Sequence, residues 1–520
     1  MAAELVMESI EYEKTVGQNI VDTVVKEEYV IPDTRPDVKQ ILMVDAKPKI
    51  INTEIMQDKV YVEGQVEFNV IYLGTGDSKN DVYGVNYTSK FSNYIDIVNC
   101  ERDMICNVKP YVEHMNCNIV NERKICVQGI IEIKGKVNKV SKIEMVKDVV
   151  GIGEVQFLRN KTKIDNIIGK TTIDLIAKSN IQIPSDKEQI DEILRCDVSV
   201  HKKNVKVSDG KIEANANALV EILYKAKDSG QINYISDDVE ISGEESIDGS
   251  DPTMDNDSIF RVDAYEFNVK QDDLGENRII STEAIVKCDA KVINRMEINS
   301  IDDVYSPETV LDVKKKDYRI NMIKEHAFSE AIVKENIEVP SEYPNPSGIV
   351  AAYGKVIVTD KKVFENKVSI EGILNVSVLY RTSDKENNVY ALNEDIPFAN
   401  SAEIEGCKID MVCDVRANIE NIESTLEANT IAIKSLISFD QKVSYENDRS
   451  FIVNVEPSED GIPEKKASIT IYCIQDGDSL WKIAKNYATT VESIVKANNI
   501  EDENLVAPGQ KLIIPGRAVI

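Results

Sequence analysis

The sequence predicts a mainly β protein, with three tandem antiparallel β-sandwich-like repeat units and a small α+β domain of the order strand, helix, helix, strand. Three observations lead to this prediction. A set of markers recurs three times at fixed separations, long segments alternate between apolar and polar residues, and the last fifty or so residues place two amphipathic helical patterns between two apolar runs. Alternation with a period of two is typical of strands with one buried face.

The repeat is marked by an aliphatic-proline pair with a tyrosine forty residues after the proline. The three sets are Ile31-Pro32 with Tyr72, Ile183-Pro184 with Tyr224, and Val339-Pro340 with Tyr380. A lysine follows each proline after 27 residues, and the prolines lie 152 and 156 residues apart. Since chance does not easily align several markers three times, the sequence predicts three copies of one unit. We expect them at residues 1–157, 158–313 and 314–455.

The clearest strand in each copy follows the marker lysine. In the first copy the apolar residues of one parity are Val60, Val62, Val66, Phe68, Val70 and Tyr72, and the same pattern starts at Ile212 and Val368. Regularly spaced strands favour a sandwich in each copy. Gly64 and Gly372 share one repeat position and indicate a bulge. Within the units, helix is expected only in the stretch before each proline marker, for example at 173–178 and 328–334.

The C-terminal segment begins with a linker, because residues 456–467 are rich in proline, glycine and charge and cannot form a core. In the domain expected at 468–520, Asp476-Gly477 makes a turn and Asp478 or Ser479 caps a helix. The apolar stripe of this helix is Leu480, Ile483, Ala484 and Tyr487. Thr490 caps a second helix, and a strand follows the Pro508-Gly509 turn.

This segment closely resembles a LysM domain. The matching residues are Gly477-Asp478-Ser479-Leu480, Ile483-Ala484, Tyr487, Asn498, Pro508-Gly509-Gln510-Lys511-Leu512 and Pro515. The resemblance implies a βααβ module that commonly binds N-acetylglucosamine chains. It places a groove at Gly477, Asp478, Ser479, Leu480, Asn498, Asn499, Ile500 and Leu505. Core packing is the alternative for Leu480 and Ile500. Trp481, the single tryptophan, lies beside the apolar stripe and is interpreted either as a contact residue or as partly core.

Composition narrows the classes of partner. The net charge of −29 argues against nucleic acid and against an anionic bilayer, because both would repel this surface. No run of about 18 apolar residues occurs, and the first residues lack the basic head and apolar core of a secretory signal. The nine cysteines follow no C-x-x-C spacing, so we interpret them as reduced thiols.

Catalytic and metal chemistry has little support in the sequence. The three histidines, His114, His201 and His326, are far apart in sequence and have no nucleophile motif beside them. The motifs H-E-x-x-H, G-x-S-x-G and G-x-G-x-x-G are absent. We therefore expect no enzyme activity, no cofactor and no metal.

The order of three β-rich units and one C-terminal LysM domain resembles the SipL group of clostridial spore-coat morphogenetic proteins, which are SpoIVA-interacting and SpoVID-like. The resemblance implies a non-catalytic scaffold in the mother-cell cytoplasm. Its LysM domain would dock onto the coat-basement ATPase SpoIVA and help the coat encase the forespore. The alternative is a protein that binds wall or cortex peptidoglycan through N-acetylglucosamine.

Overall fold

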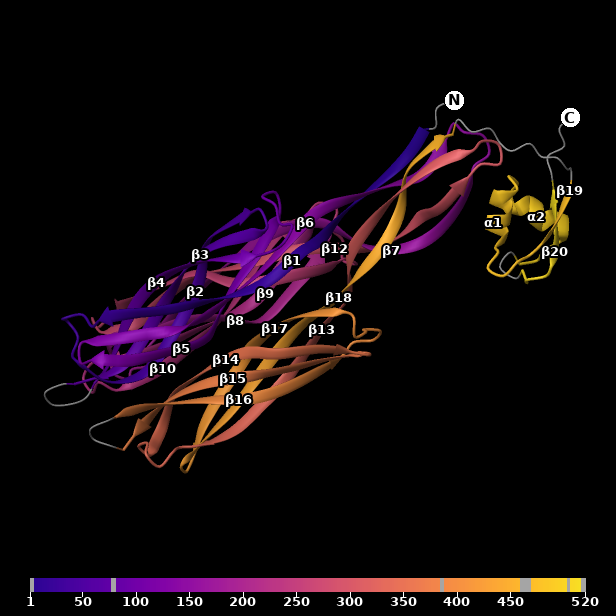
Figure 1. Cartoon of the computed structure of the whole chain (residues 1–520). Helices are drawn as coiled ribbons and strands as arrows, with labels where there is room; N and C mark the ends of the chain where they lie inside the picture. Colours follow the sequence, from indigo (N-terminus) through magenta and orange to yellow (C-terminus); the bar gives the residue numbers. More distant parts are fainter. Residues whose placement is uncertain (1–3, 76–80, 384–387, 459–468, 503–505, 516–520) are drawn as a thin grey trace.

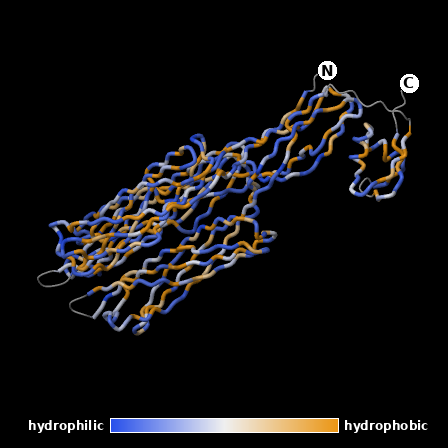
Figure 2. Tube along the Cα trace, viewed as in Figure 1, coloured by the Kyte–Doolittle hydropathy of each residue, from blue (hydrophilic) through white to orange (hydrophobic). Residues whose placement is uncertain are grey.

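The computed structural model describes residues 4–75, 81–383, 388–458, 469–502 and 506–515. The described residues form six three-stranded antiparallel sheets and one two-stranded sheet. This confirms the predicted fold class. Figure 2 shows apolar and polar residues alternating along the long strands, which is the pattern that gives each strand one buried face.

Each repeat copy consists of six strands in two sheets. The first copy comprises β1 (Glu4–Val30), β2 (Val38–Met56), β3 (Lys59–Gly74), β4 (Val82–Asp96), β5 (Ile105–Asn121) and β6 (Lys124–Val150). The second comprises β7 (Gln156–Gln182), β8 (Ile190–Ser208), β9 (Lys211–Ala226), β10 (Ile232–Ser246), β11 (Asp255–Gln271) and β12 (Asn277–Tyr305). The third comprises β13 (Leu311–Glu338), β14 (Pro346–Phe364), β15 (Lys367–Thr382), β16 (Val389–Glu403), β17 (Val412–Glu427) and β18 (Thr430–Pro457).

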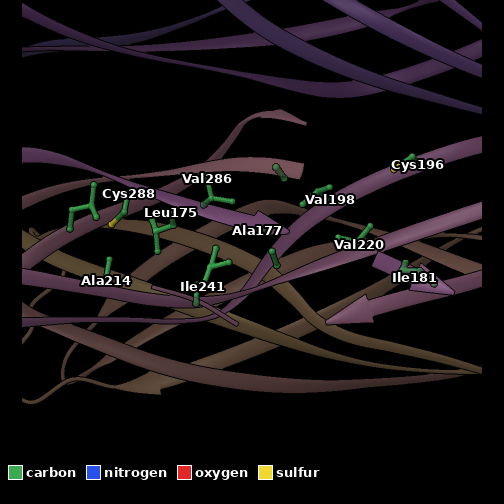
Figure 3. Close-up of a cluster of buried hydrophobic side chains, with 14 of the residues drawn as sticks. Leu175, Ala177, Ile181, Cys196, Val198, Ala214, Val220, Ile241, Val286 and Cys288 are labelled. Atoms are coloured by element: carbon green, nitrogen blue, oxygen red, sulfur yellow. The ribbon is translucent and has the colours of Figure 1, made fainter. Parts of the chain in front are cut away.

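The two sheets of a copy are a meander and a crossover sheet. The second, third and fourth strands form the meander, with the third strand in the centre. The first strand pairs with the sixth, which also pairs with the fifth. The two sheets face each other over one apolar core, as Figure 3 shows for the second copy, where Leu175 and Val286 of one sheet point toward Ala214 and Ile241 of the other. Each copy is therefore a sandwich.

The sequence markers occupy fixed structural positions. Each marker lysine begins the central strand of its meander. The marker tyrosines lie in the sandwich cores and are at most 2% exposed. The Tyr72 hydroxyl donates a hydrogen bond to the Pro36 carbonyl over 3.1 Å, and Tyr380 repeats this with Pro344 over 3.2 Å. These tyrosines therefore tie the central strand to the turn that follows the first strand.

The helices expected at 173–178 and 328–334 are wrong, because both segments lie inside the long strands β7 and β13. Along β7, Ile173, Leu175 and Ala177 are buried. Ile176 lies between them on the outer face and is 54% exposed. An aliphatic residue on the solvent side obscures the period of two, and the segment then resembles a helical stripe.

The glycines at the shared repeat position make room for an aromatic ring. Opposite Gly372 the register shifts between Val358 and Asp360, so the bulge lies in the neighbouring strand β14 and not at the glycine itself. A Cβ on Gly372 would overlap the ring of Phe398 and lie 2.5 Å from the carbonyl oxygen of Ile357. Gly64 and Phe91 repeat this arrangement in the first copy. The third copy therefore needs glycine at this position.

The three copies pack around a common pseudo-three-fold axis. Residues at one repeat position, Ile71, Leu223 and Leu379, meet in a single buried cluster between the three meanders. Arg195 of the second copy joins the same region, since it donates a 2.9 Å hydrogen bond to Asp45 of the first copy. The Arg195 guanidinium also lies 3.9 Å from the ring centroid of Tyr353 in the third copy. The copies therefore form one body.

Three two-stranded ribbons, each made of the first and sixth strands of one copy, extend this body along the axis. Strand β6 pairs with β5 only up to Asn138, but it pairs with β1 as far as Val150. Beyond Asn138 the sheet therefore continues as a ribbon of two strands, and the other two copies repeat this arrangement. The ribbons bury one another through Tyr12, Ile164 and Ile320, which share one repeat position. Nearer the tip of the ribbons, Val149, Val304 and Val455 also share one repeat position and are buried together in a second cluster. Figure 1 shows the ribbons as a narrow stalk that runs from the broad part of the body toward the C-terminal module.

The C-terminal module lies beside the tip of this stalk (Figure 1). It consists of β19 (Ile469–Cys473), α1 (Leu480–Asn486), α2 (Val491–Asn498) and β20 (Lys511–Pro515), which confirms the predicted order. Ser479 and Thr490 cap the two helices. Most of the expected linker, 456–467, lies outside the described residues.

All nine cysteines are free thiols, and seven of them are buried. Burial raises the pKa of Cys106 to about 11 and that of Cys117 to about 12, so both stay protonated near neutral pH. Among the described residues, neither helix has the length and apolar content needed to cross a membrane.

Replacing Gly372 with Ala should destabilise the protein by about 1–3 kcal/mol, because the added methyl group overpacks the contact with Phe398. Thermal unfolding followed by circular dichroism measures this. Gly348→Ala is the matched control, since it lies in the same sheet and a Cβ there has no neighbour within 4 Å. Equal melting temperatures for the two variants would contradict the packing argument.

Candidate functional site

The candidate site lies on the terminal module, whose small core holds both helices against the two-stranded sheet. Strands β19 and β20 pair antiparallel from Ile469 with Pro515 to Cys473 with Lys511. Leu480, Ile483, Ala484, Ile494 and Leu512 are each at most 3% exposed and form the centre of the core. So short a chain has little else to stabilise it, so these contacts fix the helix positions.

The first expected groove segment is a capped turn. Gly477 is exposed and has a φ of 79°, a conformation that favours glycine. The Asp478 carboxylate accepts hydrogen bonds from the Tyr472 hydroxyl at 2.7 Å and from the Gln475 backbone at 2.8 Å. These bonds hold the pKa of Asp478 below its usual value. Ser479 accepts a 3.3 Å hydrogen bond from the backbone of Lys482.

The second expected groove segment follows α2. The Asn498 amide group donates to the carbonyls of Ile494 and Ile513 over 2.8 and 2.7 Å, and its oxygen accepts from the Ile513 backbone over 2.7 Å. Asn498 therefore clamps α2 to β20. Asn499 is exposed and has a φ of 49° as the C-cap of the helix. Ile500 is half-buried against the core.

The expected groove residues thus divide into two groups. Leu480 is 3% exposed and lies within the module core, while Asp478, Ser479 and Asn498 hold the backbone in place. Gly477 and Asn499 remain exposed on the surface. Leu505 lies outside the described residues. The exposed positions are those that a ligand can reach without disturbing the core.

Trp481 contacts the β body of the same chain. Its indole N–H donates a 2.8 Å hydrogen bond to the carboxylate of Asp303 near the end of β12. Its ring meets the ring of Tyr305 edge-on, with centroids 4.8 Å apart. Lys485, one helical turn further on, donates to both oxygens of Asp303 at 2.7 and 2.8 Å. We call Asp303, Tyr305, Trp481 and Lys485 the docking contact.

Tyr305 completes the docking contact from the body side. It is 5% exposed and packs in the apolar core of the module itself. Its hydroxyl donates a buried 2.9 Å hydrogen bond to the Thr489 carbonyl in the turn between the two helices. The body therefore supplies one side chain of the module core, and this fixes α1 relative to the stalk.

The electrostatics of the docking contact centre on Asp303. Burial alone would raise the pKa of this carboxyl group, but the hydrogen bonds from Lys485 and Trp481 outweigh burial and lower its pKa. Burial raises the pKa of the Tyr305 hydroxyl to about 12, so this group remains a donor at neutral pH. The docked state is thus favoured by an ionised Asp303.

Neither body residue of the docking contact can be identified from the sequence alone. Asp303 and Tyr305 lie about 180 residues before the residues that they meet, in a strand with many other acids. One signal was available, because a lone tryptophan beside an apolar stripe requires a partner for its indole N–H. That signal indicates that a partner exists without locating it.

The described residues contain no group of three or more His, Cys, Asp and Glu side chains arranged to hold a metal ion.

Replacing Asp303 with Asn should weaken docking by about 1–3 kcal/mol, because the charge-assisted hydrogen bonds of Trp481 and Lys485 are lost. The chain has one tryptophan, so its fluorescence reports this contact alone. We expect red-shifted emission in the variant. Glu297→Gln removes an ion-paired acid from the same strand and serves as the control. Unchanged emission in Asp303→Asn would rule out the docking contact.

Docking should also depend on pH. Because the pKa of Asp303 is lower when docked than when undocked, the stabilisation is complete above the ordinary pKa of an aspartate, about 3.9. It is lost as the pH falls through the lowered value. Trp481 emission should therefore stay constant from pH 7 to about 5 and change only in stronger acid. A transition near pH 6 to 7 would assign docking to another group.

Comparison with known families identifies the two kinds of domain. A family model described as the SipL SPOCS domain matches residues 37–120, 189–270 and 347–427, and a LysM domain model matches residues 472–515. The three SPOCS matches run from the second to the fifth strand of each copy. The ribbon strands lie outside them. No solved structure matches the chain at a significant level.

Three curated relatives share short segments with this chain. The probable autolysin SsaALP of Staphylococcus aureus is 53% identical over 47 residues, or 9% of this chain and 17% of that protein. SpoIVD-associated factor A of Bacillus subtilis is 42% identical over 50 residues, or 9% and 13%. The spore coat assembly protein ExsA of Bacillus cereus is 38% identical over 50 residues, or 9% and 8%. The chain thus spans less than a fifth of each relative.

The order of the domains distinguishes this chain from a protein that merely contains a LysM domain. Three SPOCS matches, each on an equivalent part of one sandwich, precede the single LysM match. The chain therefore belongs to the SipL SPOCS-domain family and carries a C-terminal LysM domain.

Proposed function

We propose that the protein is a non-catalytic scaffold of spore-coat morphogenesis whose LysM domain binds a SpoIVA-type coat-basement ATPase. It would act in the mother-cell cytoplasm at the forespore surface and promote encasement by the coat. Two relatives with coat-assembly or SpoIVD-associated names support this proposal, as does the combination of SPOCS and LysM domains.

One structural observation carries the proposal. The docking contact uses Trp481 and Lys485 on α1, while Gly477 and Asn499 remain exposed at the two ends of the expected groove. A partner can therefore bind the groove while the body holds the LysM domain. The partner would contact the surface around Gly477 and Asn499. Trp481 would hold the domain in position without touching the partner.

A rigid attachment suits a scaffold for a physical reason. A domain held in one orientation loses little orientational freedom when its partner binds, so more of the contact energy appears as affinity. Several such scaffolds on one surface also gain avidity from their fixed spacing. No chemical step is required, and both matched families are binding or assembly domains.

The second candidate function is binding of peptidoglycan N-acetylglucosamine chains. It is favoured by the 53% identity to a probable autolysin, which is higher than the identity to SpoIVD-associated factor A or to ExsA. Binding to purified sacculi, compared with binding to the purified ATPase, separates the two functions. Retention on sacculi that chito-oligomers compete away would support the glycan function and contradict the protein-docking function.

Replacing Asn499 with Gly should weaken binding of the ATPase by about three- to tenfold, through loss of about one hydrogen bond from an exposed side chain. Glycine adopts the φ of 49° without strain, so the fold is kept. Surface plasmon resonance with the full chain measures the affinity. Glu492→Ala on the exposed side of α2 is the control. Equal affinities for both variants would place the contact outside the groove.

A further inference from the structure

A cavity of about 770 Å³ lies on the pseudo-three-fold axis, between the three copies. All three copies line it. Glu13, Asp165 and Asn321 contribute one set of equivalent positions from the first strands, and Lys136, Lys291 and Lys442 contribute another from the sixth strands. The cavity lies in the body, and its occupation is independent of the function proposed for the LysM domain.

The lysines form a ring because the strand register repeats. Lys136 pairs in register with Asn107, Lys291 with Asp257, and Lys442 with Asp414, so each sixth strand places a lysine at the same height. Alternation along a strand directs equivalent residues to the same face. Three ammonium groups therefore line one space, although like charges repel.

The charge of the lining is opposite to that of the whole chain. Seven cationic side chains line the cavity: Lys49, Lys109, Lys136, Arg261, Lys291, Arg416 and Lys442. Five carboxyl groups line it: Glu13, Asp165, Asp257, Asp263 and Asp289. The lining thus has an excess of cations in a protein whose net charge is −29.

Most of these cations already have an acidic partner. Arg416 and Lys442 bind the Asp257 carboxylate over 2.6 and 2.5 Å, and Lys291 binds Glu13. The ammonium nitrogen of Lys136 lies 3.3 Å from a carboxylate oxygen of Asp414. These pairs explain how the ring is tolerated, since charges that are removed from water require partners.

Lys49 donates a 2.7 Å hydrogen bond to the backbone carbonyl of Asp263. The ammonium group of Lys109 has no hydrogen bond or ion pair within the described part of the chain. Burial lowers its pKa to about 8, and the nearby Arg416 and Lys442 add to this, while Asp257 and Asp414 oppose it. A half-buried ammonium group that faces other cations is unfavourable unless an anion offsets the charge. The Asp257 and Asp414 carboxylates thus offset part of the charge of Lys109, but among the described residues neither binds its ammonium group directly.

We propose that this cavity binds a small multivalent oxyanion, a compound with several phosphate or carboxylate groups, and that Lys109 contacts it directly. The volume suits a small molecule, and binding at the junction of the three copies would hold them together. An anion would supply the missing partner of Lys109 and reduce the repulsion among Lys136, Lys291 and Lys442.

Isothermal titration calorimetry of the full chain with tripolyphosphate and with citrate, at constant ionic strength, tests this proposal. We expect one anion per chain. Binding of tripolyphosphate alone would assign the site to phosphate groups, and binding of citrate alone to carboxylate groups. Lys109→Gln should weaken binding about tenfold, because one charge-assisted hydrogen bond is lost.

Two controls keep the test decisive. Lys142→Gln removes an exposed, ion-paired lysine from β6 and should leave the affinity unchanged. Without anion, Lys109→Gln should melt at or above the temperature of the parent protein, because an unpaired cation is gone, so loss of binding is not loss of folding. Absence of binding for both anions, or equal affinity in Lys109→Gln, would overturn the proposal.

Discussion

Mutual burial of the three copies is the interaction on which the rest of this structure depends. Each ribbon of two strands presents an apolar face that its own sandwich cannot cover, and the other two ribbons cover it through Tyr12, Ile164 and Ile320. An isolated two-stranded ribbon is marginal in water, so the stalk is stable only as a set of three. At the broad end Ile71, Leu223 and Leu379 join the meanders in the same way.

This packing also determines where the LysM domain sits. Strand β12 continues through the stalk and ends at Tyr305, whose ring enters the LysM core. Asp303, two residues earlier, holds Trp481 and Lys485. These contacts fix the orientation of the LysM domain relative to the stalk. The exposed groove positions therefore keep a defined direction relative to the body.

The sequence predicted the features that depend on local pattern. Alternation revealed the sandwiches, the spacing of prolines and tyrosines revealed three copies, and capping residues located both helices. The sequence did not predict the features that depend on contacts between residues far apart in the chain. The exposed Ile176 disguised a strand as a helix, and the contact between Arg195 and Asp45 joins residues of different copies. Ion pairs between copies produce no periodic pattern in the sequence, so the acids that form them cannot be recognised among the 90 acidic residues of the chain.

Calorimetric unfolding of the full chain tests most directly whether the three copies form one body. Because the copies share buried clusters at both ends of the axis, they should unfold together. We expect one cooperative transition for residues 4–458, with a calorimetric enthalpy equal to the van 't Hoff enthalpy, beside a smaller transition for the LysM domain. Three separate body transitions would show that the copies fold independently and would contradict this account.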